Sequence, residues 1–147
     1  MSLATTVFLG LGLSARHAAA LSVTAATGRR RVRATEVAYP IPATDGTTID
    51  KDNQLILVRY QGALYAFALS CPHQNTALRW LNEDNRFQCS KHKSKYEPDG
   101  KFISGRATRH MDRLPIRTDG SQVYVDPDRV FESDKDAAGW AAAMVKV

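Results

Sequence analysis

Two short clusters of cysteine and histidine lie in the middle of the chain. Cys71 precedes His73 with one residue between them, and Cys89 precedes His92 with two residues between them. These are the only cysteines among the 147 residues, and residues 74–88 separate the two clusters. Thiolates and imidazoles both bind transition metals, so the pattern indicates either a metal centre or a disulfide with incidental histidines.

The alternation of the four residues distinguishes three kinds of structure. A disulfide leaves unexplained why a histidine follows each cysteine so closely. A structural zinc site usually takes its cysteines from one end of the motif and its histidines from the other. An asymmetric [2Fe-2S] cluster instead needs one thiolate and one imidazole from each loop, because both cysteines bind one iron and both histidines bind the other. The alternation therefore favours a [2Fe-2S] cluster over zinc or a disulfide.

The spacing C-x-H, then fifteen residues, then C-x-x-H is the signature of the Rieske family, and residues 35–126 resemble that family. The resemblance implies one Rieske-type [2Fe-2S] cluster with four ligands: Cys71, His73, Cys89 and His92. The second loop, CSKHKSKY, resembles that of quinol-oxidising Rieske proteins. By that resemblance, Ser94 hydrogen-bonds a bridging sulfide and Tyr96 hydrogen-bonds the sulfur of Cys71. Bonds of this kind raise the reduction potential.

Four positions depart from the pattern of these relatives. Those proteins clamp the two loops with an extra disulfide, whereas this chain has Thr76 and Lys91 at the corresponding positions. Lys93 replaces the glycine that follows the second histidine, and Arg106 replaces the usual proline of a third loop, residues 105–116. The missing disulfide resembles soluble Rieske ferredoxins and the Rieske domains of oxygenases, so the chain combines features of both groups.

The elements around the motif predict a β protein. The runs 55–60 and 63–70 flank Gln61 and Gly62 as a hairpin, and residues 113–126 form another around Asp119 and Gly120. The fold class we expect is all-β, a small antiparallel β-sandwich of the Rieske type with a cluster-binding subdomain. Residues 127–147 should form a helical extension that begins at Ser133 as N-cap, with acidic residues in its first turn.

The N-terminal segment has a different composition from the rest. Residues 1–27 are small and apolar and contain no acidic residue, which is typical of a signal peptide or short anchor, with a plain helix as the alternative. Residues 28–34 are a basic junction, and their arginines follow the apolar run, so they do not form a twin-arginine export signal. The segment favours a periplasmic or membrane-associated protein, and a cytoplasmic location is the alternative.

The chain lacks the residues for catalysis of its own. A Rieske oxygenase needs a second, mononuclear iron site with two histidines and a carboxylate, and only His17 and His110 remain here. We therefore expect an electron carrier, or a redox subunit of an exported or membrane-associated respiratory-type complex. Its partner would be a cytochrome, a quinol-oxidising complex or the catalytic subunit of an oxidoreductase. The alternatives are a cytoplasmic Rieske ferredoxin that feeds an oxygenase and, third, a structural zinc module.

The charge of the chain favours acidic partners. The formal net charge is +5 and the isoelectric point is about 9.4. No nucleic-acid-binding motif accompanies this charge. Seven basic residues fall on or near the expected cluster loops and could steer an acidic partner toward the histidines: Arg79, Lys91, Lys93, Lys95, Arg106, Arg109 and Arg113.

Overall fold

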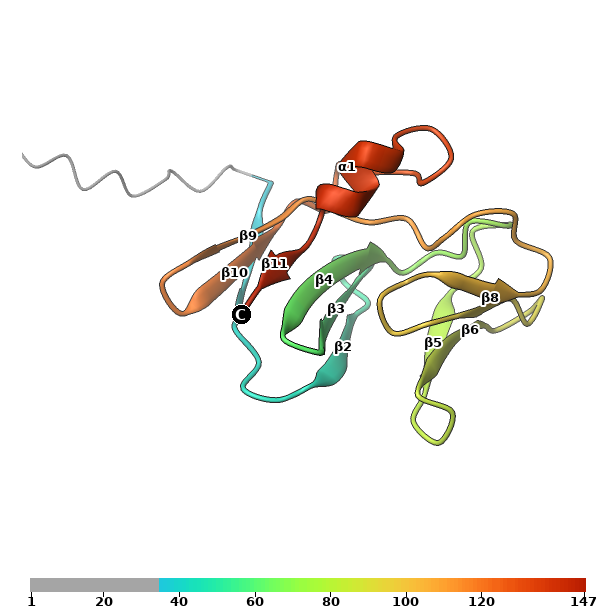
Figure 1. Cartoon of the computed structure of the whole chain (residues 1–147), viewed down its shortest axis with the longest axis horizontal. Coiled ribbons are helices and arrows are strands. Elements are labelled where there is room, and N and C mark those ends of the chain that lie inside the picture. The colour runs from blue at the N-terminus through green and yellow to red at the C-terminus, as the bar shows by residue number, and fades with distance from the viewer. Residues whose placement is uncertain (1–34) are drawn as a thin grey trace, which may run out of the picture.

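The structure is a computed structural model that describes residues 35–147, and the predicted signal, anchor and basic junction lie outside the described residues. Within this range, three antiparallel sheets and one short helix form the fold (Figure 1). The first sheet has the order β1-β10-β9, the second β11-β4-β3-β2 and the third β5-β6-β7-β8. The predicted all-β class, with a short helix near the C-terminus, is confirmed.

The bounds of the elements follow the chain. The strands of the first two sheets are β1 (Val37–Pro40), β2 (Gly46–Asp50), β3 (Leu55–Tyr60), β4 (Ala63–Ala68), β9 (Ile116–Asp119), β10 (Gln122–Val125) and β11 (Val145–Lys146). Those of the third sheet are β5 (Leu78–Leu81), β6 (Arg86–Cys89), β7 (Lys95–Tyr96) and β8 (Phe102–Ser104). The helix is α1 (Ala137–Ala142).

The hairpin β3–β4 lies at the centre of the molecule, between the other two sheets (Figure 1). Its turn residues Gln61 and Gly62 both have positive φ, 50° and 73°, which suits the twist of a two-residue hairpin. Side chains of a strand alternate between its two faces. Accordingly, Ile56 and Val58 belong to one buried cluster and Leu55 and Leu57 to another. The hairpin therefore joins two hydrophobic cores.

The C-terminal helix differs from the prediction. It begins after Asp136, whose carboxylate accepts a hydrogen bond from the backbone N–H of Gly139 at 2.8 Å, and its first turn contains no acidic residue. The predicted cap, Ser133, is wrong because its hydroxyl accepts instead from the backbone N–H of His110 at 3.2 Å. After α1, the chain adds β11 to the edge of β4. This C-terminal segment is thus packed into the second sheet.

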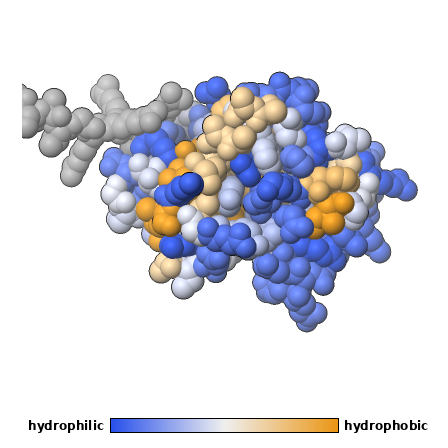
Figure 2. Space-filling model, viewed as in Figure 1, coloured by the Kyte–Doolittle hydropathy of each residue, from blue (hydrophilic) through white to orange (hydrophobic). Residues whose placement is uncertain are grey.

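No helix among residues 35–147 is long and apolar enough to cross a membrane. The visible face in Figure 2 is largely hydrophilic, with small apolar patches. One patch lies over β8, where Ile103 is exposed.

Candidate metal centre

Two loops with the same backbone design carry the four predicted ligands. In each loop the cysteine N–H donates to the carbonyl five residues later, from Cys71 to Thr76 at 2.8 Å and from Cys89 to Ser94 at 2.8 Å. In each loop the residue four positions after the cysteine turns the chain back through a positive φ, 50° at Asn75 and 56° at Lys93. This repeat is visible in the structure but was not predicted from the sequence.

The third sheet sets the two loops side by side. The first loop leads into β5 and the second leaves β6, and these strands pair with Leu78 opposite Cys89. The backbone N–H of Ser90 donates to the carbonyl of Ala77 at 3.2 Å, which extends the pairing into the loops. The sheet therefore brings together two clusters that are well separated in sequence.

The sulfurs and the imidazoles form two separate pairs. Cys71 and Cys89 are both 0% exposed, interact with each other through their side chains and are not joined by a disulfide. His73 and His92 are half-exposed, and their ring centroids lie 4.6 Å apart with the ring planes at 84°. The two thiols are thus buried and the two imidazoles reach the surface. An asymmetric two-iron centre needs this distribution of ligands.

Unsatisfied atoms on the two histidines support a metal-binding role. The Nδ1 atoms of His73 and His92 are buried, and neither has a hydrogen-bond partner among the described residues. A buried polar atom without a partner is costly, and such atoms in a folded protein call for a ligand or a water. Among residues 35–147, no group of three or more His, Cys, Asp or Glu side chains is placed to hold a single metal ion. The donor set, two thiols and two unpartnered imidazole nitrogens, fits a [2Fe-2S] cluster.

The two cysteines have different electrostatic environments. Burial raises the pKa of Cys71, and hydrogen bonds from Tyr96 and from the backbone of His73 offset this effect only in part. Burial also opposes ionisation of Cys89, but hydrogen bonds from the backbone of the second loop outweigh it and lower the pKa of Cys89. One of these donors is the N–H of His92, which lies 3.4 Å from the Cys89 sulfur. The loop backbone thus stabilises negative charge on sulfur.

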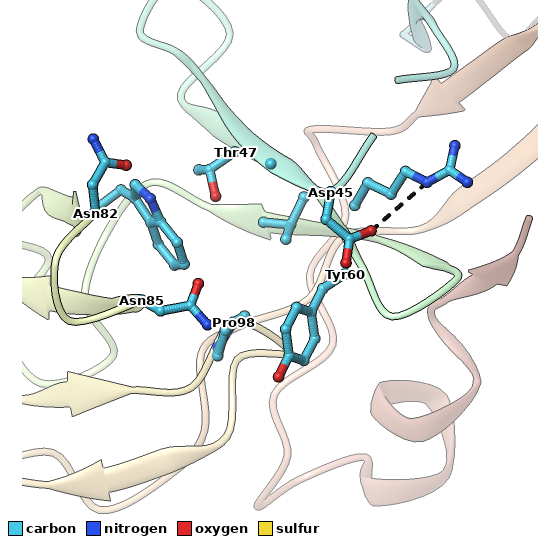
Figure 3. A pocket seen from close by; sticks show the side chains of 10 residues that line it. Asp45, Thr47, Tyr60, Asn82, Asn85 and Pro98 are labelled. Carbon is cyan, nitrogen blue, oxygen red and sulfur yellow. Dashed lines mark ion pairs between the residues drawn. The ribbon is translucent and has the colours of Figure 1, made fainter. Parts of the chain in front are cut away.

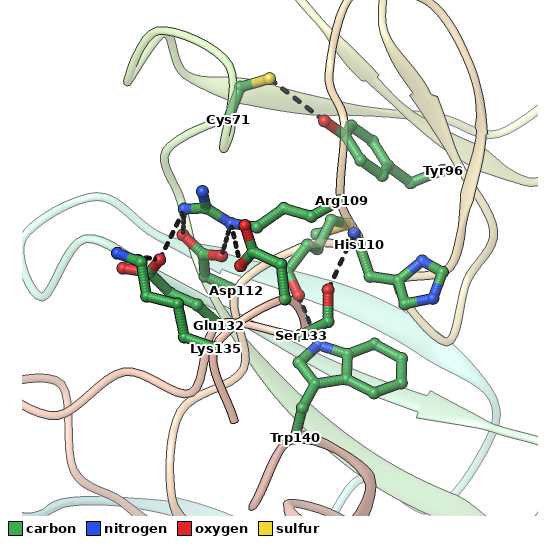
Figure 4. Close-up of polar contacts among 11 residues, drawn as sticks. Cys71, Tyr96, Arg109, His110, Asp112, Glu132, Ser133, Lys135 and Trp140 are labelled. Atoms are coloured by element: carbon green, nitrogen blue, oxygen red, sulfur yellow. Dashed lines mark hydrogen bonds and ion pairs between the residues drawn. The ribbon is translucent and has the colours of Figure 1, made fainter. Parts of the chain in front are cut away.

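Tyr96 lies directly against the first cysteine. Its hydroxyl oxygen is 3.3 Å from the Sγ atom of Cys71, and the side chain is 0% exposed (Figure 4). Burial first, and then the neighbouring Cys71, raise the pKa of Tyr96 above its ordinary value, so the hydroxyl keeps its proton. Against a cysteine thiolate, this hydroxyl is the donor.

Ser94 connects the second loop to the third. Its Oγ atom accepts hydrogen bonds from the backbone N–H groups of Arg106 and Ala107, both at 3.1 Å. The hydroxyl also interacts with the side chain of Tyr96, and by the resemblance its proton would be donated to a sulfide of the cluster. Gly105 makes this contact possible, because a Cβ atom there would meet the Ser94 Cα at 2.5 Å and its φ is +118°. Only glycine fits this close approach.

A buried arginine and a tryptophan from α1 support the third loop. The Arg113 guanidinium donates to the carbonyls of Trp140 at 2.9 Å and Asp99 at 2.8 Å, and it stacks on the Trp140 ring at 3.7 Å. Trp140 in turn donates from Nε1 to the carbonyl of Met111 at 2.7 Å. The sequence offered little sign of this role, because nothing about an isolated arginine shows that it will be buried.

Two of the seven basic residues that were expected to attract an acidic partner protein are engaged within the protein instead. Arg109 forms a two-pronged ion pair with Asp112, at 2.9 and 3.0 Å, as Figure 4 shows. Arg113 is buried, as described above. The prediction was wrong for these two side chains, because both stabilise the protein from within.

A separate pocket lies between the second and third sheets (Figure 3). It has a volume of about 240 Å³, and its lining includes Asp45, Tyr60, Trp80 and Asn85. No predicted ligand lines it. The pocket is therefore not part of the candidate metal centre.

The comparison with known families agrees with the geometry. A model of the Rieske [2Fe-2S] domain matches residues 34–117. The chain therefore belongs to the Rieske [2Fe-2S] domain family, and the cofactor of that family is one Rieske-type [2Fe-2S] cluster.

Individual relatives are more distant. The chain is 28% identical over 74 residues to the cytochrome b6-f complex iron-sulfur subunit of Chlorobaculum thiosulfatiphilum, which covers 50% of this chain and 41% of the relative. It is 28% identical over 78 residues to cytochrome b6-f complex iron-sulfur subunit 1 of Synechocystis, covering 52% and 44%. The chain thus spans less than half of the length of these curated relatives.

Two further matches differ in kind. The ferredoxin component of the alkene monooxygenase system of Xanthobacter autotrophicus is 25% identical over 76 residues, covering 50% of this chain and 62% of the relative. The crystal structure of a plasma membrane Rieske protein from Synechocystis has a TM-score of 0.45 and 20% identity, covering 54% of this chain and 82% of that chain.

Proposed function

We propose that the chain transfers single electrons through a Rieske [2Fe-2S] cluster. Cys71 and Cys89 would hold one iron of the cluster, and His73 and His92 would hold the other. The observation that carries this proposal is the pairing of two buried thiols with two imidazoles whose buried Nδ1 atoms lack partners. When bound, the cluster supplies a one-electron redox couple at a potential of roughly −150 to +300 mV, well above that of four-cysteine clusters.

The protein around the ligands has two functions in this proposal. The buried cluster of Ile56, Phe67, Phe87 and Met111 keeps water away from the cysteine sulfurs. The Tyr96 hydroxyl and the N–H of His92 each place a partially positive hydrogen next to a cysteine sulfur, Cys71 and Cys89 respectively. Such donors favour the more electron-rich state and so raise the reduction potential.

The histidines would be the point of contact with redox partners. Both rings are half-exposed, whereas both cysteines are fully buried. A donor or acceptor that touches the protein at the imidazole rings therefore approaches the metal site more closely than from any face covered by the core.

The setting of the protein is part of the proposal. We infer that it acts as a small electron carrier or as a redox subunit of a membrane-associated, respiratory-type complex. The inference is supported by two matched proteins, from Chlorobaculum and Synechocystis, that are named iron-sulfur subunits of the cytochrome b6-f complex. Residues 1–27 would serve as a signal or anchor that places the domain on the periplasmic side. The domain itself, residues 35–126, needs no catalytic site for this role.

Metal and sulfide analysis of the purified protein tests the proposal. We expect about two irons and two acid-labile sulfides per chain, and an EPR signal with an average g below 2 only after reduction. The matched variants Cys71→Ser and Cys89→Ser should each lose the cluster, because each removes half of the thiolate pair. One zinc per chain without labile sulfide would overturn the proposal.

A further inference from the structure

The chain segments around the centre carry basic residues and no acidic ones. Residues 70–82, 85–96 and 100–111 together contain eight Lys or Arg residues, whereas the 15 Asp and Glu residues of the chain all lie elsewhere. These segments include the first two loops and most of the third. The end of the molecule that presents His73 and His92 is therefore positively charged in the sequence itself.

Ion pairing separates these basic residues into two groups. Three of them pair with carboxylates on neighbouring segments, for example Arg86 with Asp84 at 2.6 Å and Lys101 with Asp99 at 2.7 Å. Five make no ion pair among residues 35–147, and we call these five the basic rim: Arg79, Lys91, Lys93, Lys95 and Arg106. Lys95 is half-exposed and the other four are exposed. The charge of the basic rim is thus free to act on a partner.

Part of the basic rim lies on the second and third loops, close to His92 in the chain or in contact with its loop. Lys91 and Lys93 flank His92 in the chain. The backbone N–H of Arg106 donates to the Oγ atom of Ser94 at 3.1 Å, which holds Arg106 beside the second loop. A negatively charged surface that approaches the histidines would meet this positive field first.

An apolar hollow lies beside the basic rim. Arg79 and Ser90 line it together with Leu69, Trp80 and Ile49, and its volume is about 550 Å³. Ile49 is 36% exposed at its edge. Protein interfaces combine an apolar centre with a charged, solvent-exposed rim, and the hollow and the basic rim together supply both parts.

From this arrangement we propose that a redox protein with an acidic face docks on the basic rim and fills the neighbouring hollow with apolar side chains. The proposal rests on the electron-transfer function above and names the class of partner. A protein partner fits better than an anionic membrane surface, because lipid headgroups on the basic rim would separate the histidines from any redox centre. Electrostatic attraction of this kind mainly increases the rate of association and weakens with salt.

Binding measurements with charge-reversed variants test the proposal. Lys91→Glu/Arg106→Glu reverses two charges of the basic rim, and Arg129→Glu/Lys146→Glu reverses two exposed charges elsewhere as a matched control. The probes are an acidic and a basic c-type cytochrome of similar size and vesicles of phosphatidylglycerol. Dissociation constants are measured at low and at high ionic strength, and iron and sulfide are determined for every preparation.

We expect the wild type to bind the acidic cytochrome at least tenfold more tightly than the basic one at low salt, and to lose this preference at high salt. The rim variant should lose or reverse the preference, whereas the control variant should keep it. Cluster-loaded protein that binds both cytochromes equally, or binds only the vesicles, would overturn the docking surface alone. Protein without labile sulfide would overturn the proposed function, and the redox partner with it.

Discussion

The substitution Tyr96→Phe removes one hydrogen bond to sulfur and leaves the packing intact. The Tyr96 hydroxyl lies 3.3 Å from the Cys71 sulfur, and the side chain is 0% exposed, so water cannot replace the lost donor. The ring also packs edge-on against Phe102 at 5.9 Å, and phenylalanine keeps this contact. The variant should therefore fold and bind the cluster like the wild type.

The size of the effect follows from the value of a hydrogen bond to a charged group. Such a bond contributes about 1.5–3 kcal/mol, which corresponds to about 65–130 mV for a one-electron couple. The oxidised state also accepts this bond, though less strongly, so the upper figure is a limit. We expect the midpoint potential of Tyr96→Phe to fall by tens of millivolts.

Protein-film voltammetry at neutral pH measures this shift, with visible absorption to confirm that the cluster is present. Tyr39→Phe is the matched control, because it also removes a tyrosine hydroxyl bond, to Asp50 at 2.7 Å, but in a different part of the structure. An unchanged potential in a fully loaded Tyr96→Phe protein would refute the reasoning. So would an equal fall in the control.

Three further changes test the loops and the surface. Lys93→Gly should stabilise the protein by up to about 1 kcal/mol in thermal unfolding, because glycine accepts the φ of 56° at this position without strain. Gly105→Ala should lower the free energy of unfolding by about 2 kcal/mol or more, because the new Cβ atom would meet the Ser94 Cα at 2.5 Å. Gly46→Ala is the control and should not lower it, because no atom lies within 4 Å of a Cβ atom there. Asp50→Asn should lower the melting temperature above about pH 5. Hydrogen bonds from Asn53 and Tyr39 stabilise the ionised carboxylate of Asp50 and lower its pKa from 3.8 to about 2. The difference in melting temperature between the variant and the wild type should therefore vanish as the pH falls through about 2.

The sequence predicted the parts of the structure that depend on local patterns. The hairpin at Gln61 and Gly62 follows from turn chemistry between two apolar runs, and the structure confirms it. The ligand motif was visible because its residue types are rare and closely spaced. The roles of the four ligands, and of Ser94 toward the cluster, remain predictions.

The parts that the sequence did not predict depend on contacts between distant segments. Ser133 has the residue type of an N-cap, but a hydrogen bond from His110, 23 residues away, engages its hydroxyl. Arg113 and Arg109 looked like surface charges until the fold placed Trp140 and Glu132, respectively, against them. Local propensity cannot anticipate such partners, because tertiary packing selects among the conformations that it allows.

The central hairpin has a consequence for how the protein can be taken apart. β3 contributes Ile56 and Val58 to one hydrophobic core and Leu55 and Leu57 to the other. Neither core can therefore come apart without exposing one face of the hairpin. Amide hydrogen exchange should accordingly report β3 and β4 as the slowest-exchanging segments, because their amides open only by global unfolding. The loops that carry the cysteines cannot be excised as a minimal module, and a graft of this centre onto another scaffold would have to include the hairpin.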